Sequence, residues 1–189
     1  MGVVLLIALV LAAVIAGGYL VGIYNQLVQV KINVDKSWAN IEVLEKQRFD
    51  EIPRLVKICE AYMQYERETL QKVIEARSRF LHAKGPADMA QASADMGGAL
   101  KSLFALAEAY PDLKANQNFI QLQQRVSGLE NEIADRREFY NESVTINNAR
   151  ILQVPYVLFA GRLAMTAREM YKVAAAEKAP PEIKFALPQ

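Results

Sequence analysis

Residues 2–24 read GVVLLIALVLAAVIAGGYLVGIY, without one charged or amide side chain. As an α-helix this stretch is roughly 35 Å long, which is enough to cross a hydrocarbon core of about 30 Å. A cleaved signal peptide is the main alternative, but signal peptides start with basic residues and have a shorter apolar run. The stretch therefore predicts a retained membrane anchor within residues 1–30, with Tyr19 and Tyr24 at the far interface.

Basic residues follow the anchor but do not precede it. Lys31, Lys36, Lys46 and Arg48 lie beyond the apolar stretch. The positive-inside rule then places the short N-terminus outside and the rest of the chain in the cytoplasm. We expect a single-pass protein of the cell (inner or plasma) membrane, with the lipid bilayer as a partner.

Small side chains recur within the anchor, and they suggest contact between copies. Gly18 and Gly22 form a G-x-x-x-G pair, and alanines recur every four residues at Ala8, Ala12 and Ala16. Such spacing lets two helix backbones approach closely in lipid. Alanine and glycine are also common in membrane helices, so chance spacing is the alternative to self-association.

Composition excludes several function classes. All 22 basic and 21 acidic side chains lie at or beyond Lys31, and the formal net charge of +1 argues against non-specific nucleic-acid binding. The single cysteine, Cys59, excludes an intramolecular disulfide and lies on an apolar helical stripe, so we expect it in the core. The single histidine, His82, removes most histidine chemistry. We expect no catalytic residue, cofactor or metal site, and a protein that is not an enzyme.

The remaining sequence has the apolar spacing of helices. One stripe runs from Leu27 to Leu44 and a second from Leu55 to Leu81, with Pro53 between them. Pro53 either kinks one long rod or separates two helices. The rod is expected to end at residues 84–86, which read Lys-Gly-Pro.

Three further helices are expected along the chain. They cover about residues 87–109, 113–154 and 156–177, with a turn at 110–112 and a proline-containing tail at the end. Long helices joined by short turns predict an all-α fold, an elongated antiparallel bundle over residues 31–155 behind the anchor. Residues 156–189 form a separate amphipathic segment and tail.

Several blocks of this sequence resemble the LemA family. The most specific block is Tyr110 to Phe119, which reads YPDLKANQNF. Shorter matches are Tyr24-Asn25-x-Leu27, Val34-Asp35-x-x-Trp38 and Glu130-Asn131-x-Ile133, and together they span about residues 20 to 150. The resemblance implies a bacterial, single-span membrane protein with a small outer N-terminus and a helical bundle inside the cell. The resemblance supplies no enzymatic activity. Over residues 156–178 this sequence departs from the family's pattern.

The family-like block is the first candidate site. Its polar side chains lie near the start of a long helix, where free backbone N–H groups bind anions. Capping of that helix and fixing of the loop is the simpler interpretation, and we favour it. The residues concerned are Tyr110, Pro111, Asp112, Lys114, Asn116 and Asn118.

A second candidate set would fix the register of the bundle or form a subunit contact. Arg136 and Asn147 fall on the apolar stripe of the helix predicted over 113–154, and a buried arginine needs a carboxylate partner. Asp35, Asp50 and Glu66 are candidate partners. Trp38 is interpreted as a core anchor in preference to a ligand contact.

The last predicted helix is basic and amphipathic. Such a helix can lie in the membrane surface or pack on protein, and packing on protein is the preferred alternative. The membrane-surface candidates are Phe159, Arg162, Leu163, Arg168 and Lys172.

From these features we expect a self-assembling homo-oligomeric scaffold at the membrane. The alternative is a membrane-tethered adaptor in signalling or envelope quality control, which would recruit another protein.

Overall fold

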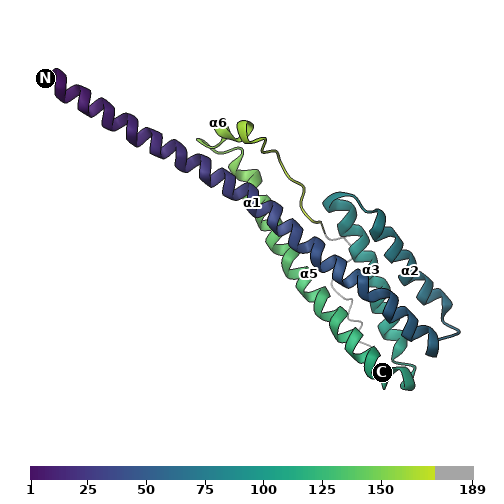
Figure 1. Ribbon diagram of the computed structural model, residues 1–189. Coiled ribbons are helices and arrows are strands. Elements are labelled where there is room, and N and C mark those ends of the chain that lie inside the picture. The colour runs from purple at the N-terminus through teal and green to yellow at the C-terminus, as the bar shows by residue number, and fades with distance from the viewer. Residues whose placement is uncertain (173–189) are drawn as a thin grey trace, which may run out of the picture. The chain divides into compact units, whose positions relative to one another are not determined.

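The computed structural model describes residues 1–172, and within them the chain is helical without a strand. This confirms the predicted all-α class and the long apolar helix at the N-terminus (Figure 1). The long helices are α1 (Gly2–Tyr62), α2 (Arg67–His82), α3 (Gly85–Ala107) and α5 (Gln117–Arg150). The short ones are α4 (Pro111–Lys114), α6 (Val157–Ala160) and the 3₁₀ turn η1 (Gly161–Leu163).

The contacts divide the chain into two compact units. Unit 1 comprises Met1–Val43 and Ala134–Met170. Unit 2 comprises Leu44–Ile133, together with Tyr171 and Lys172 among the described residues. Helices α1 and α5 each contribute to both units.

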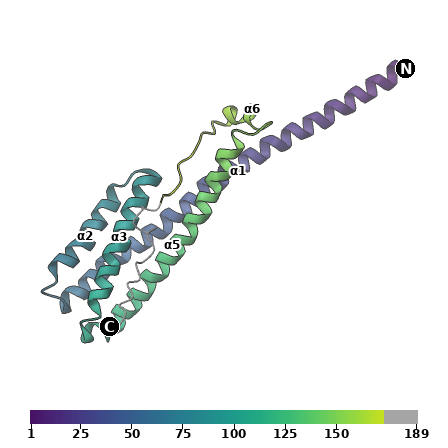
Figure 2. The same cartoon turned by 180° about the vertical axis from the view of Figure 1, so that it is seen from behind.

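Unit 2 packs four helical segments around one apolar core. They are the last third of α1, all of α2 and α3, and the first half of α5 (Figure 2). Short turns reverse the chain between successive segments, as in an up-and-down bundle. The fully buried core side chains include Ile52, Leu55, Cys59, Met63, Val73, Ala76, Leu103, Leu113 and Val126.

Helix α1 passes through Pro53 and ends at Tyr62, so the prediction of one rod reaching Lys84 is wrong. Pro53 is exposed, and the chain reverses at Met63–Glu66 instead. No glycine or proline lies in that turn. Met63 is fully buried at the reversal, which indicates that packing of α1 against α2 sets the turn. The turn at Met63–Glu66 therefore carries no helix-breaking residue that would mark it in the sequence.

The turn between α2 and α3 is where the sequence predicts it. Gly85 has a φ of 78°, in the left-handed region that glycine enters without steric cost. Pro86 then occupies the first turn of α3, where the missing N–H is not needed.

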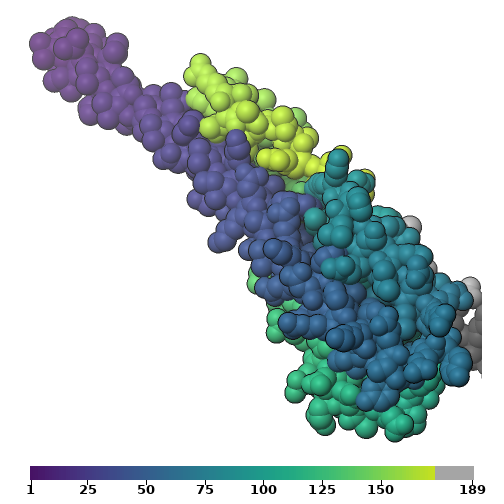
Figure 3. All heavy atoms as spheres, turned by 45° about the vertical axis from the view of Figure 1, so that its right-hand side comes forward, coloured from purple at the N-terminus to yellow at the C-terminus, as the bar shows by residue number. Residues whose placement is uncertain are grey.

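In unit 1, α1 and α5 lie side by side (Figures 1 and 2). The rings of Trp38 on α1 and Tyr140 on α5 pack with their centroids 5.3 Å apart. Nearer the N-terminus, Ile23 and Leu27 of α1 are buried in a cluster with Ala160 and Met165. Figure 3 shows the chain that follows α5 lying against α1.

The predicted helix over 156–177 is wrong within the described residues. Only α6 and η1 form there, and the chain leaves the helix at Ala164, whose φ is 49°. The N–H of Met165 bonds to the carbonyl of Ala160 at 3.0 Å, and that of Ala164 to Gly161 at 3.2 Å. This is a Schellman helix end, and Met165 packs in the same cluster as Ala160. Residues 173–177 lie outside the described residues.

Helix α1 carries one segment that could cross a membrane by length and composition. Its most apolar window has a mean hydropathy of 2.8, and none of that window is buried. The side chains of residues 1–21 are exposed throughout.

Candidate functional site

A buried ionic cluster lies in the core of unit 2, where helices α1, α3 and α5 meet. Arg48 of α1 is 1% exposed, and its Nη2 lies 2.5 Å from Glu45 Oε2 and 2.6 Å from Ser93 Oγ. Its other terminal nitrogen bonds to Glu130 of α5. Two carboxylates therefore offset one buried guanidinium, which satisfies the charge that burial would otherwise penalise.

The sequence contains a signal for this cluster that our sequence analysis missed. Ile41, Glu45, Arg48, Ile52 and Leu55 follow one another at spacings of four and three, so all five share one helix face. Charged side chains at such positions are buried when they find partners.

Arg136, the arginine predicted to be buried, is exposed instead. Its guanidinium carbon lies 5.9 Å from the centroid of the Phe139 ring. The side chain borders a polar hollow of about 210 Å³ in unit 1, together with Lys36, Asn33 and Asn40. Asn147, predicted on the same stripe, is 3% exposed. The helical period of 3.6 residues places Asn147 on the buried face of α5 and Arg136 just beside that face.

The segment that follows η1, residues 165–172, has no regular secondary structure, and its part in unit 1, residues 165–170, bonds to side chains of α5. Asn148 pairs with both main-chain groups of Arg168, donating to its carbonyl at 2.9 Å and accepting from its N–H at 2.8 Å. Asn147 donates to the carbonyl of Thr166 at 3.0 Å. Tyr140 donates to the carbonyl of Glu169 at 2.9 Å. Side chains of α5 thus supply the hydrogen bonds that a helix would have supplied internally.

Two side chains of the segment add contacts of their own. Arg168 lies 3.3 Å from Asp35 of α1, in an exposed ion pair. Tyr171 is 1% exposed in unit 2, and its hydroxyl is 3.2 Å from both Glu45 Oε1 and the carbonyl of Met89. The Tyr171 side chain therefore ends at the Arg48 cluster.

The pKa of Tyr140 is raised above its ordinary value. Desolvation by burial raises this pKa more than the nearby charge of Arg168 lowers it.

The remaining predicted residues near α6 separate into two groups. Phe159 and Leu163 pack against the apolar cluster on α1, so they are partly buried. Arg162 and Lys172 are exposed. The structure therefore does not place the five membrane-surface candidates on one helix face.

The YPDLKANQNF block forms α4 and the start of α5. Asn116 Oδ1 accepts from the N–H groups of Asn118 and Phe119, at 2.9 and 3.2 Å, and so caps α5. Asp112 lies in the first turn of α4, and Leu113 beside it is fully buried. Lys114 pairs with Glu108.

The same block holds the turn between α1 and α2. Tyr110 donates to Glu66 at 2.9 Å, which raises the pKa of the tyrosine. Asn116 donates to the hydroxyl of Tyr62 at 3.0 Å. Pro111 starts α4 in its first turn. Through these contacts the block fixes the turn and caps α5. The amide oxygen of Asn116 is occupied by the two N–H groups of α5 that it caps.

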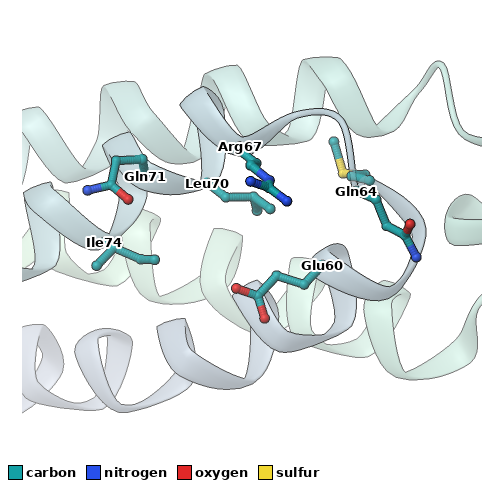
Figure 4. A pocket seen from close by; sticks show the side chains of 7 residues that line it. Glu60, Gln64, Arg67, Leu70, Gln71 and Ile74 are labelled. Atoms are coloured by element: carbon teal, nitrogen blue, oxygen red, sulfur yellow. The ribbon is translucent and has the colours of Figure 1, made fainter.

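An open hollow of about 420 Å³ lies at the α1–α2 turn (Figure 4). Glu60 of α1 and Arg67 of α2 supply charge beside the apolar side chains of Leu70 and Ile74. The neighbouring Tyr65 is 95% exposed.

The groups that could carry chemistry are placed as follows. Cys59 is buried in the core of unit 2, and burial raises the pKa of its thiol to about 12. His82 is exposed at the end of α2, with Nδ1 2.8 Å from the carbonyl of Ser78. Within residues 1–172, no three His, Cys, Asp or Glu side chains gather as a metal site would require. Asp50 is exposed on α1.

Comparison with known proteins places the chain in a family. The model of the LemA family matches residues 37–185. A curated relative, protein LemA of Metamycoplasma hominis, is 28% identical over 135 residues, which cover 69% of this chain and 60% of the relative. The match therefore spans less than two thirds of that relative's length.

Proposed function

We propose that this chain, which belongs to the LemA family, holds its helical bundle at a membrane and assembles there with further copies of itself. The observation that carries the proposal is the contrast within helix α1. Its first 21 residues are exposed and apolar, whereas Ile52, Leu55 and Cys59 of the same helix are fully buried. An apolar surface of that length is stable in a hydrocarbon core and unfavourable in water.

Charge distribution supports one orientation. The first basic side chains lie beyond the anchor, at Lys31 and Lys36, and none precedes it. In the cell membrane this distribution favours an outer N-terminus and a cytoplasmic bundle.

Self-association is supported by the free surface of the anchor. Ala8, Ala12 and Ala16 are exposed, and a Cβ added to Gly18 or Gly22 would meet nothing within 4 Å. A second helix can therefore approach the backbone closely there, which strengthens packing in lipid.

The test measures the mass of the full-length protein by light scattering in two detergents. We expect an oligomer, and we expect Gly18→Ile with Gly22→Ile to reduce it toward the monomer. Gly17→Ile is the matched control, because Gly17 lies about 100° from Gly18 around the helix axis. A monomeric wild type in both detergents would remove the assembly proposal.

The proposal assigns no reaction to the chain. The thiol of Cys59 is buried and its pKa is raised, and the buried Arg48, Glu45 and Ser93 bind one another. Side chains held in this way stabilise the packed core and are poorly placed to react with a substrate.

The hollow at the α1–α2 turn favours a second candidate function, a tethered adaptor. It combines the charges of Glu60 and Arg67 with the exposed ring of Tyr65. A photoreactive residue in place of Tyr65 would then give one cross-linked species of defined mass, lost in Ile74→Glu. Cross-links that persist in Ile74→Glu would reject the adaptor.

A further inference from the structure

Four aliphatic side chains are exposed where α5 passes into α6. They lie in unit 1 and form what we call the apolar tip. Leu152, Val154 and Leu158 are 77%, 80% and 72% exposed, and Val157 is 42% exposed. Four exposed aliphatic side chains within seven residues of the chain are a candidate surface for another apolar phase to cover.

The tip is fixed beside the end of the anchor. Ile151, Tyr156 and Phe159 pack against the cluster that buries Ile23 and Leu27 of α1. The hydroxyl of Tyr156 also donates to Gln26 Oε1 at 2.6 Å. In Figure 3 this part of the chain lies directly against α1. The tip is therefore held level with the point where the exposed apolar stretch of α1 ends.

Three basic side chains lie close to the tip along the chain or on α1. The Arg150 guanidinium stacks 4.4 Å from the centroid of the Tyr156 ring, and Arg162 is exposed. Lys31 donates to the carbonyl of Leu163 at 3.1 Å. Lys31 is eight residues beyond Ile23, or about 12 Å along the helix, which is a few Å beyond a headgroup layer of about 5–8 Å. Cations close to that layer suit lipid phosphates.

We propose that the apolar tip inserts into the lipid leaflet from which α1 emerges, giving the protein a second membrane contact beside its anchor. The lipid bilayer is the occupant that the structure favours, because the tip continues the apolar surface of α1 at the same level. The inference rests on the membrane anchoring proposed above. It differs from the predicted amphipathic helix, since Phe159 and Leu163 face α1 and other side chains face outward.

Depth-dependent fluorescence quenching of the full chain in phosphatidylcholine and phosphatidylglycerol vesicles tests the proposal. A solvatochromic probe is attached to a cysteine introduced by Val154→Cys or Leu158→Cys. Matched positions are Val10→Cys in the anchor and Val43→Cys, 20 residues beyond Ile23, or about 30 Å along α1. Cys59 does not take up label at neutral pH, because it is buried and its pKa is raised to about 12.

We expect lipid-borne quenchers to reduce both tip signals several-fold more than the Val43 signal, and aqueous iodide to show the opposite order. Iodide quenching of both tip probes would overturn the inference, because the tip is then in water. Protection from iodide without lipid quenching would also overturn it, because protein then covers the tip. Lipid quenching at Val10 separates the two proposals. If Val10 is quenched and the tip is not, only the inference fails; if Val10 is not quenched, the anchoring itself fails.

Discussion

At the scale of single residues, Arg48 is the side chain whose environment is least like that of its type. It carries a charge into the core of unit 2, where the two carboxylates of Glu45 and Glu130 and the hydroxyl of Ser93 receive it. Residues from three helices thus share one network. A buried network of this kind adds little net stability when complete, but it is costly to leave incomplete.

Removing the guanidinium should therefore destabilise unit 2 strongly. We expect Arg48→Met to lower the free energy of unfolding by about 3–5 kcal/mol, because the carboxylates lose their counter-charge in the core. Chemical denaturation of the full chain in detergent, followed by circular dichroism, measures this change. Arg54→Met is the control, since the Arg54 side chain is 75% exposed in its pair with Glu51 and a loss below about 1 kcal/mol is expected. Equal losses in the two variants would contradict the assignment.

Cys59 gives the fold a pH dependence of known sign. Burial, and to a smaller extent the charge of Glu60, raises the pKa of its thiol from 9.0 to about 12. The unfolded thiol ionises first, so its contribution to stability is complete below pH 9 and is lost as the pH rises toward 12.

The free energy of unfolding should accordingly fall more steeply above pH 9 in the wild type than in Cys59→Ala. The difference in slope approaches about 1.4 kcal/mol per pH unit. Urea titrations at a series of pH values measure it, and parallel profiles for the two proteins would refute it.

At the scale of elements, sequence and structure agree where a local signal marks the boundary. Gly85 and Pro86 mark the α2–α3 turn by their backbone preferences, and Pro111 starts α4. They disagree where packing decides: the α1–α2 reversal at Met63 contains no helix breaker, and a single alanine ends η1.

The candidate sites divide in the same way. The cap at Asn116 could be anticipated, because an asparagine before a helix has a local partner. The Arg48 cluster depends on three helices meeting, so only the helix-face spacing hints at it. The hydrogen bonds of Asn148 depend on a segment that the sequence pattern assigns to a helix.

The end of η1 is a place where one substitution should stabilise the protein. Ala164 occupies the left-handed region, which costs a residue with a Cβ roughly 1 kcal/mol relative to glycine. Ala164→Gly should raise the free energy of unfolding by about that amount, measured by chemical denaturation. Ala149→Gly, in the exposed last part of α5, should change it by about 1 kcal/mol in the opposite direction. Destabilisation by both changes would argue against this helix end.

The segment beyond η1 should be held by Asn148. Asn148→Ala removes the acceptor for the Arg168 N–H and the donor to its carbonyl. We expect amide hydrogen exchange at Arg168 to accelerate by about 10- to 100-fold, in line with the loss of one to three kcal/mol of hydrogen bonding. Asn131→Ala, an exposed asparagine of the same helix, should leave that amide unchanged. Unaltered exchange in Asn148→Ala would show that other contacts hold the segment.

At the scale of the whole molecule, α1 is the element that contains both the proposed membrane anchor and part of the bundle. The same helix contains the exposed apolar stretch and part of the buried core of unit 2. Composition alone predicts the first role, because hydropathy is read residue by residue. The second role needs the partner helices to be in place.

Charges introduced into the apolar stretch should release the protein from membranes. Leu11→Arg with Ala12→Asp costs about 5–7 kcal/mol of insertion free energy, from roughly 2.5–3.5 kcal/mol for each charge at a helix centre. We expect the double variant to move from the pellet to the supernatant after an alkaline carbonate wash of membranes. The same charges beyond the stretch, Ala39→Asp with Val43→Arg, should leave the protein in the pellet. Retention of both variants would reject α1 as the anchor.

The way in which Asn148 holds residue 168 bears on how freely the chain can change over evolutionary time. At residue 168 its amide group bonds to the backbone N–H and carbonyl, which almost every amino acid offers; proline is the exception because it lacks the N–H. Substitutions at position 168 therefore keep this pair of hydrogen bonds, whereas most substitutions at position 148 lose it. Mutational tolerance should be broad at one end of the contact and narrow at the other.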